Sequence, residues 1–134
     1  MEKARGKYRD IKFYSEKNGR IICVHTKMAR DYAVWLEKQQ SLDSYEVNIP
    51  FESERLAYVN PVEIRKLYFQ TDWASDFLLH FRDGHKAIRE MSSLDNLMKL
   101  ATIEKLELSR RYWKALGIDD WRLVLPQQLG GVER

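Results

Sequence analysis

The sequence predicts an α/β protein in which a mixed β-sheet is flanked by helices. Three observations lead to this prediction. Two segments carry apolar residues at helical spacing, several short apolar segments are bounded by turn residues, and the two kinds of segment follow one another along the chain. Elements in such an order bury their apolar faces by packing helices against the faces of a sheet.

The N-terminal part predicts a β-hairpin and then a helix. Residues 7–25 contain two strand-like segments around the turn EKNGR, in which Asn18-Gly19 is a strong hairpin signal. A helix is expected over about 27–39, with Thr26 as its N-cap. Its apolar face would consist of Met28, Tyr32, Trp35 and Leu36.

The middle of the chain predicts four strands. They are SYEVNIPFE (44–52), IRKLYFQ (64–70), DFLLHF (76–81) and KAIREM (86–91). A loop with Asn60-Pro61 separates the first two, and an Asp83-Gly84 turn joins the last two. DFLLHF is almost continuously apolar, as expected of a central strand that is covered on both faces.

The C-terminal part predicts a longer helix and a last strand. The helix covers about 102–116, and Gly117 suits the position just after it. Its buried face would consist of Ile103, Leu106, Trp113 and Leu116. The strand is WRLVL, 121–125.

The bulk composition is that of one globular domain, so we expect residues 1–134 to form a single unit. No apolar run approaches the roughly 20 residues of a membrane span. The only cysteine, Cys23, has no disulfide partner and predicts a reduced, buried thiol in a cytoplasmic protein. No Cys/His spacing predicts zinc, because His25, His80 and His85 are scattered.

The charge is unevenly distributed. The net charge is +3, yet residues 1–30 hold nine Lys/Arg and three acids. A basic leader of about 1–12 suits a DNA backbone, because neutralised phosphates release counterions. The candidate phosphate contacts are Lys3, Arg5, Lys7, Arg9 and Lys12, with Arg110 and Arg111 on the second long helix. A solvated N-terminus and a solvated helix face explain the same residues.

Two acids stand at the ends of neighbouring strands. Asp76 opens one strand of the predicted 76–91 hairpin, and Glu90 lies near the end of the other. Together with the carbonyl of Met91 they would offer hard oxygen ligands for Mg²⁺ or Mn²⁺. The alternative is structural: Asp76 caps a turn, and Glu90 faces solvent at an edge.

Three longer stretches resemble the TnsA endonuclease family, whose N-terminal domain has the restriction-endonuclease-like PD-(D/E)XK fold. They are GRIICVHTKMARDYAVWLEKQQSLDSYEVNIP, TDWASDFLLHFRDGHKAIREMS and TIEKLELSRRYWKALGIDDWRLVL, which lie in the family's order within residues 7–126. The resemblance implies a Mg²⁺-dependent nuclease that cuts transposon 5′ ends beside a transposase subunit. The family's C-terminal helical domain is expected to be absent.

The chain departs from the family pattern at two positions. Asp76 and Glu90 match the family's acids, but Ala29 stands where the first helix should supply a Glu. Ser92 stands where the motif should supply a Lys, and neither residue can replace the missing charge. Lys99 or Lys105 is a candidate for a migrated lysine.

Three hypotheses follow. The first is a DNA- or transposase-binding protein of transposition whose cutting site is impaired. The second is an active endonuclease on double-stranded DNA with migrated catalytic groups. The third is a small protein-interaction module without catalysis.

Overall fold

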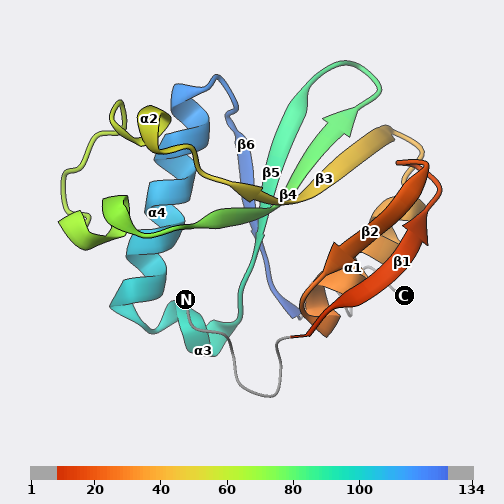
Figure 1. Ribbon diagram of the computed structural model, residues 1–134, viewed down its shortest axis with the longest axis horizontal. Helices are drawn as coiled ribbons and strands as arrows, with labels where there is room; N and C mark the ends of the chain where they lie inside the picture. The colour runs from red at the N-terminus through yellow and green to blue at the C-terminus, as the bar shows by residue number, and fades with distance from the viewer. Residues whose placement is uncertain (1–8, 127–134) are drawn as a thin grey trace.

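The computed structural model describes residues 9–126, which form two sheets with covering helices (Figure 1). The elements are β1 (Ile11–Ser15), β2 (Arg20–Val24), α1 (Lys27–Glu37), β3 (Leu42–Pro50), α2 (Ser53–Leu56), the 3₁₀ helix η1 (Lys66–Gln70), β4 (Ala74–Phe81), β5 (Lys86–Met91), α3 (Leu94–Leu97), α4 (Leu100–Ala115) and β6 (Asp120–Val124). The predicted α/β class, with a mixed sheet flanked by helices, is confirmed.

The larger sheet has the strand order β3-β4-β5-β6, and β1 pairs with β2 in a separate two-stranded sheet. β3, β4 and β5 form an antiparallel meander, whereas β6 runs parallel to β5. A parallel pair needs a crossover connection, and α4 lies in the one between β5 and β6 (Figure 1). The DFLLHF segment lies in β4, an interior strand with three consecutive buried residues, as predicted.

Side chains of β4 and β5 alternate between two hydrophobic cores. Phe77, Leu79 and Ala87 pack in a cluster with α1 and the β1–β2 hairpin. Leu78 and Ile88 pack in a second cluster with α4. This alternation follows from the two-residue period of a strand. The sheet therefore separates the two cores.

The predicted first helix is present as α1 and ends two residues earlier than expected. The Thr26 side chain accepts a hydrogen bond from the Ala29 backbone N–H at 3.1 Å, as an N-cap should. The buried residues of α1 are Ala29, Tyr32, Ala33 and Leu36. Ala29 is therefore part of the first core, where its small side chain lets the helix approach the sheet.

The second long helix, α4, begins two residues earlier than expected and buries only part of the predicted face: Trp113 is buried and Leu106 is half-buried. Ile103 and Leu116 were predicted to be buried, but both are exposed. Glu104, Leu108 and Tyr112 are buried instead. Glu104 can occupy a buried position because its Oε1 accepts a hydrogen bond from the Arg65 backbone N–H at 2.9 Å. An apolar pattern alone does not reveal such a position.

The C-terminal end of α4 is followed by Gly117, as the sequence predicted. Gly117 has a φ of 87°, and its N–H donates to the Lys114 carbonyl at 2.9 Å. The N–H of Ile118 donates to the Trp113 carbonyl at 2.9 Å. This pair of bonds is a Schellman motif, which uses glycine because it adopts positive φ without strain.

The strand predicted over residues 64–70 is wrong, because the segment contains the 3₁₀ helix η1. Tyr68 donates its backbone N–H to the Arg65 carbonyl three residues earlier, and no ladder bonds form. Its side chain is buried, while neighbouring Leu67 is exposed. Cys23, predicted to be buried, is only half-buried.

Within the described residues, no helix combines the length and the apolar character that crossing a bilayer requires.

Candidate functional site

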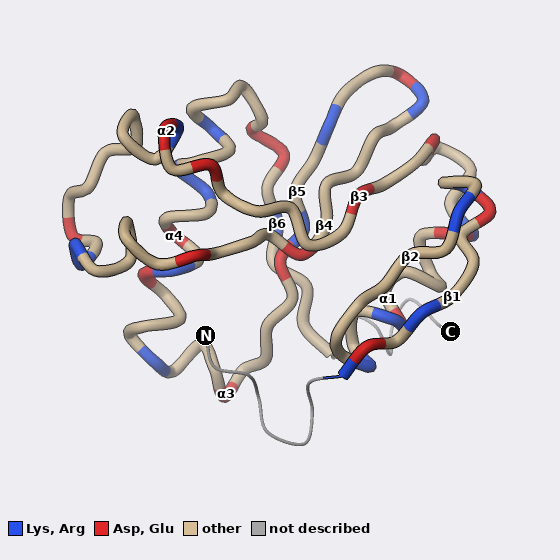
Figure 2. Tube along the Cα trace, in the orientation of Figure 1, with Lys and Arg blue, Asp and Glu red and all other residues tan. Residues whose placement is uncertain are grey.

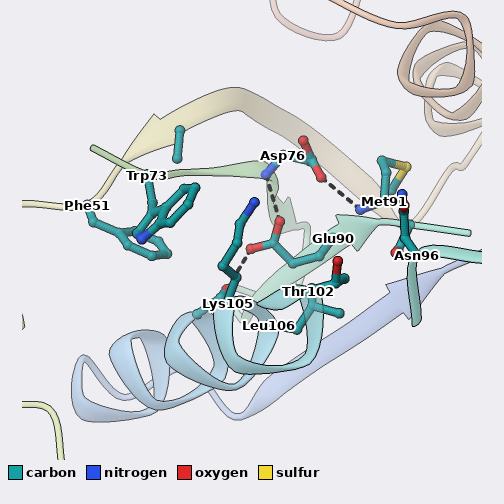
Figure 3. A pocket seen from close by; sticks show the side chains of 12 residues that line it. Phe51, Trp73, Asp76, Glu90, Met91, Asn96, Thr102, Lys105 and Leu106 are labelled. Carbon is teal, nitrogen blue, oxygen red and sulfur yellow. Dashed lines mark hydrogen bonds between the residues drawn. The ribbon is translucent and has the colours of Figure 1, made fainter. Parts of the chain in front are cut away.

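A pocket of about 290 Å³ opens between β4, β5 and α4 and contains both predicted acids (Figure 3). Asp76 comes from β4 and Glu90 from β5. Ser92, Trp73, Lys105 and Ser109 also line it. The structure thus brings together side chains from two strands and a helix, of which Asp76 and Ser109 are 33 residues apart in the sequence.

Each of the two acids accepts a hydrogen bond from a backbone N–H of the strand that carries the other acid. The β4–β5 ladder has its last paired residues at Phe77 and Arg89. Beyond this point the Asp76 N–H donates to Glu90 Oε1 at 3.1 Å, and the Met91 N–H donates to Asp76 Oδ2 at 2.8 Å. Side-chain carboxylates thus replace backbone carbonyls as acceptors, which places both acids at the end of the ladder.

Strand β4 changes its facing at Asp76. In a regular strand Ser75 and Phe77 would face the same side of the sheet. Phe77 lies in the α1 core, but Ser75 Oγ accepts a hydrogen bond from Trp113 Nε1 of α4 at 2.8 Å. On neighbouring β3, Asn48 has a φ of 53°, which asparagine tolerates better than most residues. This irregularity lies beside Asp76, which lines the pocket.

A buried serine fixes the carboxylate of Glu90. Ser109 Oγ of α4 donates to Glu90 Oε2 at 2.5 Å and accepts a hydrogen bond from Trp121 Nε1 at 2.9 Å. It also lies 3.4 Å from Ser75 Oγ. Sequence reasoning missed Ser109, since a serine on a helix carries no signal until the helix is docked on the sheet.

The pocket shifts the titration of its charged groups. Burial, together with the charge of nearby Asp76, raises the pKa of Glu90 to about 8. Burial also raises the pKa of Asp76, although the hydrogen bond from the Met91 N–H acts in the opposite direction. Two carboxylates in one low-dielectric site cannot both ionise easily without a cation.

Lys105 supplies a cation beside the acids. Its Nζ lies 4.1 Å from the centre of the Trp73 ring, and its side chain rises from α4 into the pocket (Figure 3). Trp73 is held in turn by a hydrogen bond from its Nε1 to the Tyr68 carbonyl at 2.9 Å. Partial burial lowers the pKa of Lys105, while the charges of Asp76 and Glu90 oppose that shift.

The other predicted catalytic positions lie in three different surroundings: the pocket, the α1 core and the exposed surface. Ser92 lines the pocket, and its backbone N–H donates to the Val124 carbonyl of β6. Ala29 lies in the α1 core and is not among the lining residues. Lys99 is exposed at the N-cap of α4 and does not line the pocket either. Of the two candidate migrated lysines, only Lys105 lines the pocket that contains the acids.

The donor set fits a hard divalent cation. Asp76 and Glu90 provide carboxylate oxygens, and Met91 lines the same pocket. Magnesium is usually bound by one or two carboxylates, with waters and substrate phosphates as its remaining ligands. A cation would also offset the burial that raises the pKa values of both acids and the Asp76 charge that further raises the pKa of Glu90.

The predicted phosphate contacts have different surroundings. Lys3, Arg5 and Lys7 lie outside the described residues, whereas Arg9 and Lys12 are exposed. Arg110 and Arg111 both pair with Glu107 at 2.7 Å. Basic and acidic residues are interspersed along the described trace rather than gathered in one basic stripe (Figure 2).

Arg111 is held more firmly than its neighbour. Its Nη1 donates to the carbonyls of Asn60 and Val62 at 2.6 and 2.8 Å. It therefore ties the loop after α2 to α4, a role that the sequence did not predict.

No protein-family model matches the chain, and a search of curated proteins finds no match either.

Proposed function

We propose that this chain is a metal-dependent endonuclease of the TnsA-like, restriction-endonuclease-like class, in which Lys105 replaces the missing motif lysine. The observation that carries the proposal is the position of Lys105, whose side chain enters the pocket of Asp76 and Glu90 from α4. Three ionisable groups, two carboxyl groups and one amine, thus line one accessible cavity.

Each residue has a separate task in this proposal. Asp76 and Glu90 would hold Mg²⁺ or Mn²⁺, with the Met91 carbonyl as a further oxygen ligand. The bound ion would supply a hydroxide nucleophile and stabilise negative charge on the scissile phosphate. The Lys105 ammonium, kept in place by the Trp73 ring, would pair with a phosphate oxygen of the DNA.

The position of Ala29 supports a site that functions without the helix acid. Ala29 is buried in the α1 core, so a glutamate there would place a charge among apolar side chains. Ser92, by contrast, lines the pocket, and a longer side chain at this position can extend into the cavity. Of the two positions that depart from the family pattern, only Ser92 can therefore be replaced by the family's residue without placing a charge in the apolar core.

The proposed substrate is double-stranded DNA, with a transposase subunit as the partner and the cytoplasm as the location. The basic leader supports DNA binding because cationic side chains release counterions from the phosphate backbone.

A second candidate is a protein of the same class that binds DNA or a transposase but cuts poorly. It is favoured by the raised pKa of Glu90, which keeps this acid protonated at neutral pH. Both acids also accept hydrogen bonds from the protein itself. A metal ion would have to compete with these protons and donors.

The deciding experiment measures nicking of supercoiled DNA in Mg²⁺ and in Mn²⁺. The unaltered chain is compared with Asp76→Asn, Lys105→Met and the matched control Lys99→Met, which removes an exposed lysine outside the pocket. We expect metal-dependent nicking that Asp76→Asn and Lys105→Met reduce by at least about 100-fold, as loss of a charge-stabilising group does. Lys99→Met should cut normally.

A relocated lysine provides an independent check. We expect the double variant Lys105→Met/Ser92→Lys to regain part of the nicking that Lys105→Met loses. Equal activity of Lys105→Met and the unaltered chain would overturn the role of Lys105. Cutting only by the double variant Lys105→Met/Ser92→Lys would establish the second candidate, and no DNA binding by any variant would leave a protein-interaction module.

A further inference from the structure

A second cluster of potential metal ligands lies away from the pocket, at the open end of the β1–β2 hairpin. Asp10, Cys23 and His25 each offer one ligand atom, and these atoms all lie within 4.8 Å of one another. Asp10 Oδ1 is 3.2 Å from His25 Nδ1. The sequence spacing had predicted no zinc site, but the fold brings a thiol, an imidazole and a carboxylate together.

The hairpin register explains this convergence. Cys23 and His25 are two residues apart on an extended segment, so their side chains share one face. Ile22 and Val24, between and beside them, face the α1 core. Because Ile11 pairs with Val24, the preceding residue Asp10 lies across from His25. The cluster is therefore on the outer face of the small sheet.

The surroundings leave this face accessible and hold its backbone. Cys23 and His25 are half-buried, and Asp10 is exposed, so an ion can enter from solvent. The Asn48 side chain donates to the Cys23 carbonyl at 3.2 Å, which links this part of β2 to β3. The Arg9 N–H donates to the His25 carbonyl at 3.2 Å, which extends the pairing of the two strands.

The ligand types differ from those of the Asp76–Glu90 pocket. Thiolate and imidazole favour borderline ions such as Zn²⁺ over Mg²⁺. In a tetrahedral zinc site, metal–ligand bonds of about 2.0–2.3 Å place the ligand atoms roughly 3.3–3.8 Å apart. The 3.2 Å between Asp10 and His25 is close to this spacing, and side-chain rotation of Asp10, Cys23 and His25 would bring the remaining distances, all within 4.8 Å, into this range.

We infer that Asp10, Cys23 and His25 form a zinc-class metal site with three protein ligands and one open coordination position. The ion would join the start of β1 to the residue just before the Thr26 N-cap of α1. It would thereby stabilise the pairing of β1 with β2 at the open end of the hairpin, since a ligand that binds only the folded state stabilises it.

The test is a titration of the full chain with Co²⁺, a spectroscopic substitute for Zn²⁺, under a reductant that does not bind metal. We expect one equivalent of Co²⁺ to produce a thiolate-to-cobalt absorption band, which one equivalent of Zn²⁺ then removes. Zn²⁺ should also raise Tm. Cys23→Ala should abolish the band, and Asp10→Asn should weaken binding by at least about tenfold.

Two control variants separate this site from other metal-binding groups. His80→Gln removes a histidine that pairs with Glu46 at 2.7 Å but has no cysteine nearby, so it should leave the band unchanged. Asp76→Asn should also leave it unchanged, which keeps this result independent of the nuclease proposal. A band that persists in Cys23→Ala, no saturable binding of one ion, or equal affinity of Asp10→Asn would overturn the inference.

Discussion

Glu90 is the residue whose chemistry depends most on its surroundings. An acid at the end of a strand normally remains ionised at neutral pH, but here it is buried against α4 and lies near a second carboxylate. The folded protein therefore binds a proton that the unfolded chain releases between pH 4.5 and about 8. Because the unfolded state binds fewer protons in this window, the free energy of unfolding falls as pH rises.

This proton linkage predicts a pH-dependent effect of Glu90→Gln. The neutral amide removes the linkage, so the variant should gain stability relative to the unaltered chain as pH rises from 5 to 8. The slope of the difference should approach about 1.4 kcal/mol per pH unit in the middle of the window. Thermal unfolding at several pH values in metal-free buffer measures it.

Glu54→Gln is the matched control, because Glu54 is an exposed acid on α2. Its stability relative to the unaltered chain should not change with pH over the same interval. A difference between Glu90→Gln and the unaltered chain that stays constant from pH 5 to 8 would contradict the raised pKa of Glu90.

At the scale of single elements, α4 performs three tasks at once. It covers one face of the sheet, brings Ser109 and Lys105 to the acids, and holds the loop after α2 through Arg111. The sequence predicted the existence of this helix but not its facing. Glu104 and Ser109 are polar residues on its buried side, and their partners come from other segments of the chain.

The contrast between Arg110 and Arg111 yields a prediction for this element. Arg111→Ala should lower the free energy of unfolding by about 1.5–3 kcal/mol, because two backbone carbonyls lose a charged donor. Hydrogen exchange should also become faster in residues 57–65. Arg110 has only its surface pair with Glu107, so Arg110→Ala should cost less than about 1 kcal/mol. Equal effects of the two variants would contradict this assignment.

At the scale of the whole molecule, the two candidate metal sites lie in different layers and suit different ions. The Asp76–Glu90 pocket lies on the α4 side of the sheet and offers oxygen ligands. The Asp10–Cys23–His25 cluster lies on the small β1–β2 sheet and offers sulfur and nitrogen. Mg²⁺ and Zn²⁺ should therefore act separately on the same chain.

The uneven charge of the whole chain predicts how DNA binding depends on salt. If Lys3, Arg5 and Lys7 each neutralise one phosphate, replacing all three by Gln should reduce the slope of log K against log salt by about 3. Fluorescence anisotropy with duplex DNA at several salt concentrations measures this slope.

The matched control carries the same change of charge at exposed lysines elsewhere, namely Lys38, Lys66 and Lys114. It should reduce the slope much less than the leader variant does. Equal slopes for the two triple variants would mean that binding follows net charge, and the leader would not be the DNA contact.

Local signals in the sequence account for much of the fold. Three local signals each act over a few residues and can therefore be recognised within their own segments. They are the Asn18-Gly19 turn, the N-cap Thr26 and Gly117 after the end of α4. The continuous apolar run of β4 likewise predicted an interior strand. The prediction for residues 64–70 failed because apolar and aromatic composition is only a weak, context-dependent signal for a strand, and this segment forms the 3₁₀ helix η1 instead.

The candidate site required the packed chain. The sequence named Asp76 and Glu90 and left Lys99 and Lys105 as equal alternatives, because a helix position has no direction until the helix docks. Docking of α4 brought Lys105 into the pocket and left Lys99 outside it. The hairpin register likewise joined Asp10, Cys23 and His25. Local sequence thus determines where helices and strands form, whereas distances between side chains from different elements are set only when their buried faces pack together.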